Sequence, residues 1–229
     1  MLVKDITLED IHFKILINPD TKQGAQKKVY ENGIWEPKIT ELVKKLLQPS
    51  QTFIDIGAAA GWFTLLASSI VGESGKVIAF EPNPTRFQMI KESASLNGFS
   101  NIIVSDKALG EKQESTFIGG RCKGEISKSG IPIETTTLDR FLIEKGIKKV
   151  DLVKMDIEGM ELKALKGMTE TVKNNPQMKI ICELHPKLLK KYGDTQEELL
   201  RYVQSTLGMK TENIEWRYWL FARSKVNVQ

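Results

Sequence analysis

From about residue 52 onward, the sequence alternates short apolar runs with longer stretches of helical periodicity. Such short runs, rich in β-branched residues and bounded by Gly, Pro, Asn or Asp, are typical of strands buried on both faces. Five runs have these properties: Thr52–Ile56, Lys76–Glu81, Asn101–Ser105, Val150–Met155 and Met178–Leu184. Strands that alternate with helices are joined as βαβ units. The pattern therefore predicts an α/β fold with a doubly wound, largely parallel sheet.

The intervening stretches carry the spacing and the end signals of helices. Pro84 suits a first helical turn, where its missing N–H costs nothing, and Asn97-Gly98 is typical of a left-handed stop. The predicted helices are Pro37–Leu47, Trp62–Val71, Pro84–Leu96, Thr137–Lys145, Glu161–Lys173, and one that opens at Asp194 or Thr195 and ends near Leu207.

The two ends of the chain differ from this alternating core. Residues 1–49 are predicted to form a small amino-terminal extension, with a strand in the alternating segment Ile11–Ile17, and residues 50–229 the main domain. The β-prone run Ile214–Arg223 has no crossover helix after it, so it can only join the sheet as a hairpin partner or an antiparallel edge.

Composition excludes several classes of protein. The 229 residues are 41% hydrophobic and 27% charged, which is ordinary for a folded globule. A net charge of +4 is too mild for a dedicated nucleic-acid binder, so nucleic acid is an unlikely partner. Two cysteines are too few for a disulfide framework, and no run reaches the roughly 18 apolar residues of a membrane helix. We expect a cytoplasmic protein that does not enter a membrane.

The sharpest local signal is the segment Phe53–Phe63, a strand that ends in Asp55, turns at Gly57 and opens a helix near Gly61. Glycine in such a turn lets a ligand approach bare backbone, beside the unpaired N–H groups of the helix. Glu81 ends the next strand, where a carboxylate accepts hydrogen bonds from both hydroxyls of a ribose.

Two nucleotide-like ligands bind turns of this kind, dinucleotides and S-adenosylmethionine. The middle glycine of the dinucleotide motif is replaced here by Ala59. A carboxylate at Asp55 repels a pyrophosphate, whereas it attracts the ammonium and sulfonium groups of S-adenosylmethionine. The sequence therefore favours S-adenosylmethionine as the cofactor.

Five segments together resemble the FkbM family of S-adenosylmethionine-dependent methyltransferases. They are Asp55–Gly61, Phe80–Pro84, Asp106–Gly110, Val153–Glu161 and Glu183–Pro186. The resemblance extends from about Ile34 to the end of the chain, although the family commonly has Asn where Ala59 or Ala60 stands here. It implies a class I methyltransferase fold: a Rossmann-like doubly wound sheet of seven strands, the last antiparallel.

The resemblance also implies which residues bind the methyl donor. Asp55 and Gly57 would face its methionine end, and Glu81 its ribose. Asp106, with the amides that follow it, would face the adenine. The other residues expected to bind the cofactor are Ala59, Gly61, Pro82, Asn83, Lys107, Ala108 and Asp156.

Acidic residues gather where the fourth and fifth predicted strands end. The fourth strand delivers Asp156, Glu158 and Glu161, and the fifth delivers Glu183 and His185. An oxygen acceptor must lose its proton, so we predict a catalytic role for four of these residues: Asp156, Glu158, Glu183 and His185. The base is expected to be His185, with an ordinary pKa of about 6.5, or Asp156. Glu161 is predicted either to contact the substrate or to stabilise its helix, as a first-turn acid that interacts with the helix dipole.

The same acids help to decide whether a metal binds and which class of methyl acceptor fits. Asp156, Glu158 and Glu183 offer the hard oxygen ligands that Mg²⁺ prefers, but no histidine or cysteine spacing suggests zinc, and we predict no metal. Nucleic-acid amino methyltransferases carry Asn/Asp-Pro-Pro-aromatic after the fourth strand, where this chain has Asp156-Ile-Glu-Gly. An oxygen acceptor therefore fits better than the amino group of a flipped base.

The sequence thus predicts O-methylation of a small-molecule or glycan-like hydroxyl. The alternatives are an RNA or protein methyltransferase and a non-catalytic module that binds the donor. Trp35 and Glu36 are candidate substrate contacts ahead of the core, and the flexible-looking insertion 119–130 offers Arg121, Lys123 and Lys128 for an anionic group, or a merely solvated loop. Monomer and homodimer both stay open.

Overall fold

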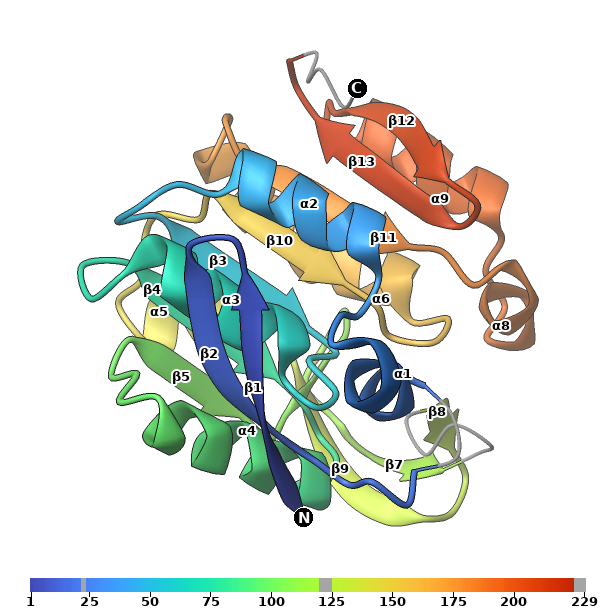
Figure 1. Ribbon diagram of the computed structural model, residues 1–229. Helices are drawn as coiled ribbons and strands as arrows, with labels where there is room; N and C mark the ends of the chain where they lie inside the picture. Colours follow the sequence, from blue (N-terminus) through green and yellow to red (C-terminus); the bar gives the residue numbers. More distant parts are fainter. Residues whose placement is uncertain (22–23, 120–124, 225–229) are drawn as a thin grey trace. The chain divides into compact units, whose positions relative to one another are not determined.

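The computed structural model describes residues 1–21, 24–119 and 125–224, and it divides into two compact units, Met1–Asp106 (unit 1) and Lys107–Gln229 (unit 2). The elements of unit 1 are β1 (Leu2–Leu8), β2 (Ile11–Ile17), α1 (Ala25–Asn32), α2 (Pro37–Leu46), β3 (Thr52–Ile56), α3 (Trp62–Val71), β4 (Lys76–Phe80), α4 (Pro84–Leu96) and β5 (Ile102–Ser105) (Figure 1). Those of unit 2 are β6 (Ala108–Leu109), β7 (Ser115–Gly119), β8 (Glu125–Ser127), β9 (Ile131–Thr136), α5 (Leu138–Glu144), β10 (Leu152–Met155), α6 (Glu161–Lys166), α7 (Thr169–Asn174), β11 (Lys179–Glu183), α8 (Pro186–Lys191), α9 (Gln196–Ser205), β12 (Lys210–Glu215) and β13 (Tyr218–Ala222). None of the helices described here is long and apolar enough to span a bilayer.

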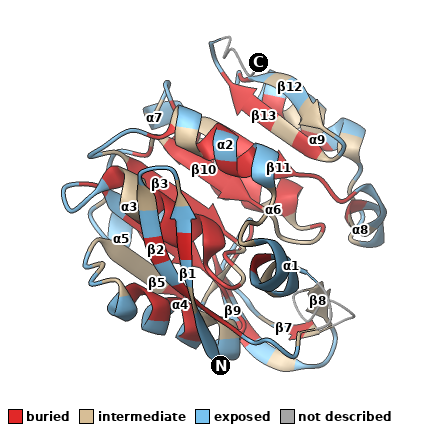
Figure 2. Ribbon diagram, in the orientation of Figure 1, coloured by how far each residue is buried: buried red, intermediate tan, exposed pale blue. Residues whose placement is uncertain are grey.

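The parallel strands β3, β4 and β5 lie side by side in unit 1. Thr52 of β3 pairs with Lys76 of β4, and Val77 of β4 with Ile102 of β5. Every residue of β3, and all of β4 except Lys76, is buried (Figure 2). Burial on both faces explains why these strands are short, mostly apolar runs in the sequence. The strands predicted there are confirmed, to within a residue at each end.

The helix signals of unit 1 act as predicted. The side-chain oxygen of Asn83 accepts the backbone N–H groups of Thr85 and Arg86, at 3.1 and 3.2 Å, and so caps α4 with Pro84 in its first turn. Gly98, just beyond the helix, has a φ of 66°, which glycine adopts at little cost. Both α3 and α4 have the predicted bounds.

An antiparallel hairpin of β1 and β2 packs on α3 and α4, so the amino-terminal extension belongs to the core of unit 1 (Figure 1). The ring of Phe13 meets the ring of Trp62 edge-on, with centroids 5.5 Å apart, and the Leu16 N–H donates to Ser93 Oγ at 3.0 Å. β1 escaped prediction because only Ile6 in it is buried. A domain boundary at residue 49 stays a prediction.

Unit 2 contains a mixed sheet in which β10 and β11 are parallel, while β13 runs antiparallel to β11 and β12 antiparallel to β13. The β-prone carboxyl-terminal run thus forms a hairpin, as expected, and the last strand is antiparallel. Both β10 and β11 are almost wholly buried (Figure 2).

Two predictions for unit 2 are wrong. The helix expected over Glu161–Lys173 is two helices, α6 and α7, because the chain breaks at Gly167-Met168. Asp139 supports the break: its carboxylate accepts the backbone N–H groups of Glu170 and Thr171, at 3.1 and 2.7 Å, and so caps the start of α7. The sequence does not show that a side chain of α5 reaches this point.

In the insertion 119–130, expected to be a flexible loop, the described residues Gly119 and Glu125–Ser127 belong to strands β7 and β8. β7 pairs antiparallel with both β8 and β9, and Phe117 faces Ser127 in the first pair and Pro132 in the second. Lys128 lies exposed beyond β8, whereas Arg121 and Lys123 lie outside the described residues. Alternating exposure along these short strands hides them from a search for apolar runs.

Replacing Phe13 by Ala tests whether the extension is part of the core. We expect Phe13→Ala to lower the free energy of unfolding by about 3 kcal/mol or more, because Phe13 is 3% exposed and its loss leaves a cavity against Trp62. Urea denaturation measures this, with Leu2→Ala in exposed β1 as the control, expected to cost well under 1 kcal/mol. Equal small losses would show that residues 1–49 fold apart from unit 1.

Candidate functional site

The turn between β3 and α3 bends through three left-handed backbone positions. Gly57, Ala59 and Gly61 have φ angles of 83°, 52° and 89°. Glycine takes this conformation freely, but for Ala59 it is uncommon. The Ala59 N–H donates to Glu81 Oε2 at 2.8 Å, which holds the turn in place. This turn therefore exposes backbone rather than side chains to the carboxyl end of the sheet.

Glu81 is the anchor of this part of unit 1. The side chain is 4% exposed, and its second oxygen, Oε1, accepts the Asn83 N–H at 2.9 Å. Burial raises the pKa of Glu81 to about 7, against the opposing effects of Arg86 and of the two amide hydrogen bonds. One carboxylate thus joins the loop after β3 to the loop after β4.

Two other predicted acids lie near Glu81 in unit 1. Asp55 is 1% exposed, and its Oδ2 accepts the Thr64 hydroxyl at 2.6 Å, which joins β3 to α3. Asp106 follows β5 and is exposed; the Glu81 N–H donates to the Ser105 carbonyl at 3.0 Å, so these strand ends are in register. Asp55, Gly57, Ala59, Gly61 and Glu81 are called the unit 1 group below.

Four other residues that were predicted to bind the cofactor lie outside the unit 1 group. Pro82 is half-buried beside Glu81, and the side chain of Asn83 is occupied as the cap of α4. In unit 2, Lys107 Nζ lies 3.4 Å from Glu134 Oε2, and Ala108 opens β6. The binding roles of these residues stay predictions.

Trp35 and Glu36, the candidate substrate contacts, lie half-buried just before α2. The Trp35 carbonyl accepts the Thr40 hydroxyl at 2.7 Å, and the same hydroxyl oxygen accepts the Trp62 indole N–H at 3.0 Å. Glu36 has a left-handed φ of 43° at the start of the helix. This segment is therefore fixed to α3, and its contact with a substrate stays a prediction.

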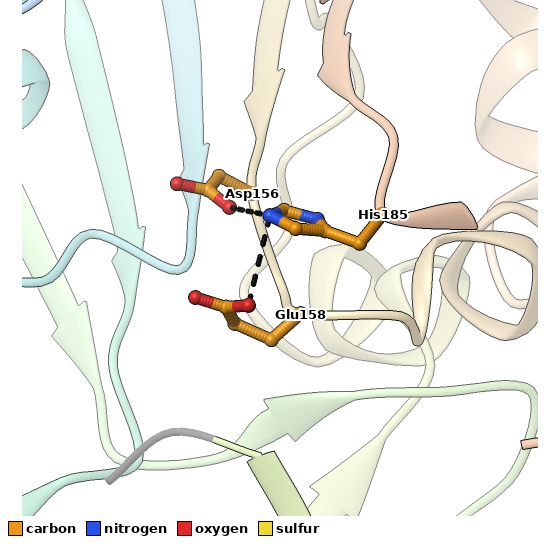
Figure 3. A group of neighbouring side chains, drawn as sticks. All are labelled: Asp156, Glu158 and His185. Atoms are coloured by element: carbon orange, nitrogen blue, oxygen red, sulfur yellow. Dashed lines mark ion pairs between the residues drawn. The ribbon is translucent and has the colours of Figure 1, made fainter. Parts of the chain in front are cut away.

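Unit 2 brings a second set of predicted residues together. β10 and β11 are parallel with Met155 opposite Cys182, so the residues that follow them emerge at the same edge. Figure 3 shows the carboxylates of Asp156 and Glu158 directed at one ring nitrogen of His185. The sequence-based expectation that these side chains meet is confirmed by the distances.

Four carboxylates surround the His185 ring. Nδ1 lies 2.9 Å from Glu161 Oε1. Nε2 lies 3.6 Å from Asp156 Oδ1, 3.6 Å from Glu158 Oε2 and 3.5 Å from Glu183 Oε1. These five residues are called the carboxylate–histidine cluster below. Within it, the ligand atoms of Asp156, Glu158 and His185 all lie within 4.8 Å of one another, which is a spacing that a metal ion requires.

The cluster changes the protonation of its members. Burial disfavours the charged form of His185, but the hydrogen bond to Glu161 and the neighbouring carboxylates outweigh it and raise its pKa to about 9. The expectation of an ordinary pKa is therefore wrong, because the sequence predicts that these acids gather near His185 but not how closely they approach its ring. Burial alone would raise the pKa of Asp156, but the nearby positive charges of Lys154 and His185 outweigh it and lower that pKa. For Glu158 and Glu183, burial prevails and their pKa values are raised.

Sequence reasoning missed three side chains that support the cluster. The Tyr218 hydroxyl donates to Glu183 Oε2 at 2.8 Å, and Arg217 Nη2 lies 2.6 Å from Glu183 Oε1. Lys154, 3% exposed, holds its Nζ 3.5 Å from Asp156 Oδ2. Tyr218 reaches Glu183 because β13 pairs with β11 in this register, which local sequence patterns do not reveal.

The loop after β10 is shaped to direct its acids. Glu158 and Gly159 have left-handed φ angles of 53° and 98°, and the Gly159 N–H donates to Glu161 Oε1 at 2.9 Å. Glu161 has no exposed surface, so the structure places it as a residue that orients His185. Its predicted contact with a substrate stays a prediction.

These two groups lie on a chain that matches a known family. The family model for the methyltransferase FkbM domain matches residues 55–220, more than half of the sequence. The chain belongs to the FkbM methyltransferase family. The resemblance inferred from five motifs is thereby confirmed, and the enzyme class of the family is the predicted one.

Curated relatives of this FkbM chain are also methyltransferases by name. The hexuronic acid methyltransferase AglP of Haloferax volcanii is 27% identical over 155 residues, which cover 66% of this chain and 62% of that protein. The chain therefore spans about three fifths of the length of that relative. A probable cobalt-precorrin-6B C(15)-methyltransferase of Sulfolobus acidocaldarius is 27% identical over 58% of this chain and 77% of its own length.

Solved structures establish the fold. A SAM-dependent methyltransferase from Aquifex aeolicus superposes with a TM-score of 0.51 at 17% identity, covering 86% of this chain and 92% of that one. The predicted class I methyltransferase fold is confirmed. Its seven strands correspond to β3, β4 and β5 of unit 1 and to β10, β11, β12 and β13 of unit 2.

The raised pKa of Glu81 predicts a pH-dependent stability. The ordinary pKa of 4.5 applies in the unfolded chain and about 7 in the folded one, so between these values the folded protein holds a proton that the unfolded chain has released. Stability from this group is full below pH 4.5 and is lost as the pH rises through 7, by on the order of 3 kcal/mol. Urea denaturation at pH 5 and pH 8 should show that Glu81→Gln removes this loss.

Glu73→Gln, at an exposed glutamate of unit 1, is the matched control and should keep the wild-type difference between the two pH values. The same pH dependence in Glu81→Gln as in the wild type would contradict a buried, protonated Glu81.

Replacing Gly159 by Ala tests the loop after β10. A Cβ there would lie 2.6 Å from Leu188 Cβ, in addition to the strain of its left-handed φ. Gly193→Ala is the matched control, because Gly193 has a φ of 87° but open space around it. We expect Gly193→Ala to cost about 1 kcal/mol in urea denaturation and Gly159→Ala about 1–3 kcal/mol more. Equal costs would show that the loop does not need this close approach.

Proposed function

We propose that this FkbM chain is an S-adenosylmethionine-dependent O-methyltransferase that acts on a small-molecule or glycan-like hydroxyl. The observation that carries the proposal is the buried Glu81 carboxylate, which orders the turn at Ala59 and the loop at Asn83 at the carboxyl end of β4. Ligands of open α/β sheets bind at this end of the strands. Family membership supports methyl transfer as the chemistry.

The unit 1 group fits the donor. Carboxylate oxygens accept more than one hydrogen bond, so Glu81 retains capacity for ribose hydroxyls while it holds the amides of Ala59 and Asn83. The turn through Gly57 presents backbone, and Asp55 adds negative charge where the positive methionine end of the donor is expected. When bound, the donor supplies an electrophilic methyl carbon.

The carboxylate–histidine cluster fits an acceptor that must lose a proton. In the transfer, the acceptor oxygen forms a bond to the methyl carbon while the sulfur–carbon bond breaks, and the hydroxyl proton passes to a base. The side chains of Asp156 and Glu158 are 24% and 29% exposed, whereas those of Glu183 and His185 are 7% and 6% exposed. We therefore assign the first contact with the hydroxyl to Asp156 or Glu158.

The glycan-like acceptor has independent support. Sugar hydroxyls donate hydrogen bonds to carboxylates, which the cluster supplies in number. AglP, a relative, is named for a hexuronic acid substrate. RNA and protein acceptors are outcomes of the test below, and the cytoplasmic location stays a prediction.

Titration calorimetry with S-adenosylhomocysteine tests the donor half. We expect micromolar binding by the wild type and a loss of about tenfold or more in Glu81→Ala, because the ribose loses a charged hydrogen-bond acceptor. Glu73→Ala should bind like the wild type. Preferred binding of NAD would contradict the assignment of the cofactor.

Methyl transfer to fractionated cell extract tests the acceptor half. Label from the methyl group of S-adenosylmethionine should appear in a small-molecule or glycan fraction. Glu158→Gln should slow the labelling by about 10²-fold or more, as the loss of an acid–base group does. Label confined to RNA or protein would overturn the proposed acceptor class.

A further inference from the structure

We propose that Asp156, Glu158 and His185 form a binding site for one divalent cation that accepts both imidazole nitrogen and carboxylate oxygen, such as Mn²⁺. Each residue offers one ligand atom, and the three atoms lie within 4.8 Å of one another. They come from two segments, the loop after β10 and the residue before α8, so no single run of acids creates the site (Figure 3). The sequence alone predicted no metal here.

The spacing of the atoms fits ligands around an ion better than partners of each other. His185 Nε2 lies 3.6 Å from Asp156 Oδ1 and 3.6 Å from Glu158 Oε2, which exceeds a hydrogen-bond length. Two ligand atoms that each lie about 2.1 Å from an ion are about 3.0–3.4 Å apart, for octahedral or tetrahedral angles. The two distances from Nε2 exceed this range by a few tenths of an ångström, so a small movement would let the ring nitrogen share an ion with either carboxylate.

One polar atom at this point lacks a hydrogen bond although it is buried. Asp156 Oδ1 has no accessible surface and, among the described residues, no hydrogen-bond partner. His185 is 5% exposed, and its one hydrogen bond to a described residue is made by Nδ1, so Nε2 faces the carboxylates without one. A buried oxygen left without a partner is one that a bound ion would satisfy.

Glu161 holds the ring as a second-shell carboxylate does in metal sites. Its Oε1 lies 2.9 Å from His185 Nδ1 and accepts the Gly159 N–H, and its side chain has no exposed surface. A hydrogen bond from Nδ1–H to a carboxylate leaves the lone pair on Nε2, which is the atom that binds a metal. Glu161 thus directs Nε2 toward Asp156 and Glu158.

The remaining charges leave the two oxygens available to a cation. Lys154 forms an ion pair with Oδ2 of Asp156, the oxygen that is not proposed as a ligand. Arg217 forms an ion pair with Glu183, which is not one of the three proposed ligands. A protonated His185 facing the same carboxylates is the competing arrangement. A bound cation would supply Lewis acidity toward an oxygen acceptor; this role, unlike the binding itself, rests on the proposed function.

Electron paramagnetic resonance with Mn²⁺ tests the site. The signal of free Mn²⁺ should decrease until one ion is bound per chain, and pulsed spectra of protein labelled with ¹⁵N-histidine should show coupling to one imidazole nitrogen. His185→Ala should abolish the coupling. Glu158→Gln and Glu161→Gln should each weaken binding by about 10- to 100-fold.

His12→Ala, at the other histidine of the chain, is the matched control and should bind Mn²⁺ like the wild type. Circular dichroism reports whether each variant is folded, and Glu158→Gln keeps the test decisive if His185→Ala unfolds. No saturable binding at millimolar Mn²⁺, or binding without histidine coupling, would overturn the proposal in favour of a protonated His185. Binding of S-adenosylhomocysteine to the same preparation, measured by calorimetry, separates this failure from a failure of the proposed function.

Discussion

Buried carboxylates at the carboxyl ends of parallel strands are the constraint around which both units are built. A carboxylate removed from water is tolerated only where amides, hydroxyls or cations reach it. Glu81 is satisfied by two backbone amides, and Glu183 by Tyr218 and Arg217. The loops take the paths that bring these donors to the acids. The acids thus determine loop shape before any ligand is present.

Both units satisfy a buried acid with a backbone N–H from a left-handed turn residue. In unit 1, the left-handed residue Ala59 donates its N–H to Glu81; in unit 2, the left-handed Gly159 donates its N–H to Glu161. Each of these turns follows a buried parallel strand. In each case an acid fixes the path of a short turn by accepting a backbone N–H. In unit 2 the turn also packs closely against Leu188, which leaves no room for a side chain at residue 159.

Local sequence patterns predicted the parts of the fold that depend on local physics. The strands β3 and β10 are buried throughout and mostly apolar, and α4 carries its own cap and stop, so both kinds of element were found. The division of the predicted helix 161–173 into α6 and α7 was not found, because the distant Asp139 supports it. The strands β7 and β9 were not found either, because exposure alternates along them. The raised pKa of His185 was missed because the sequence predicts which acids lie near the ring but not their distances from it.

The packing of β2 on α3 and α4 has a consequence for biosynthesis. The hairpin leaves the ribosome before Trp62 and Ser93, which cover it and are made dozens of residues later. At roughly 5–20 residues per second, the apolar face of β2 waits several seconds for its partners. During that interval Phe13 and Leu16 are exposed to chaperones and to neighbouring nascent chains. The yield of folded protein should therefore depend on how quickly translation proceeds from β2 to α4.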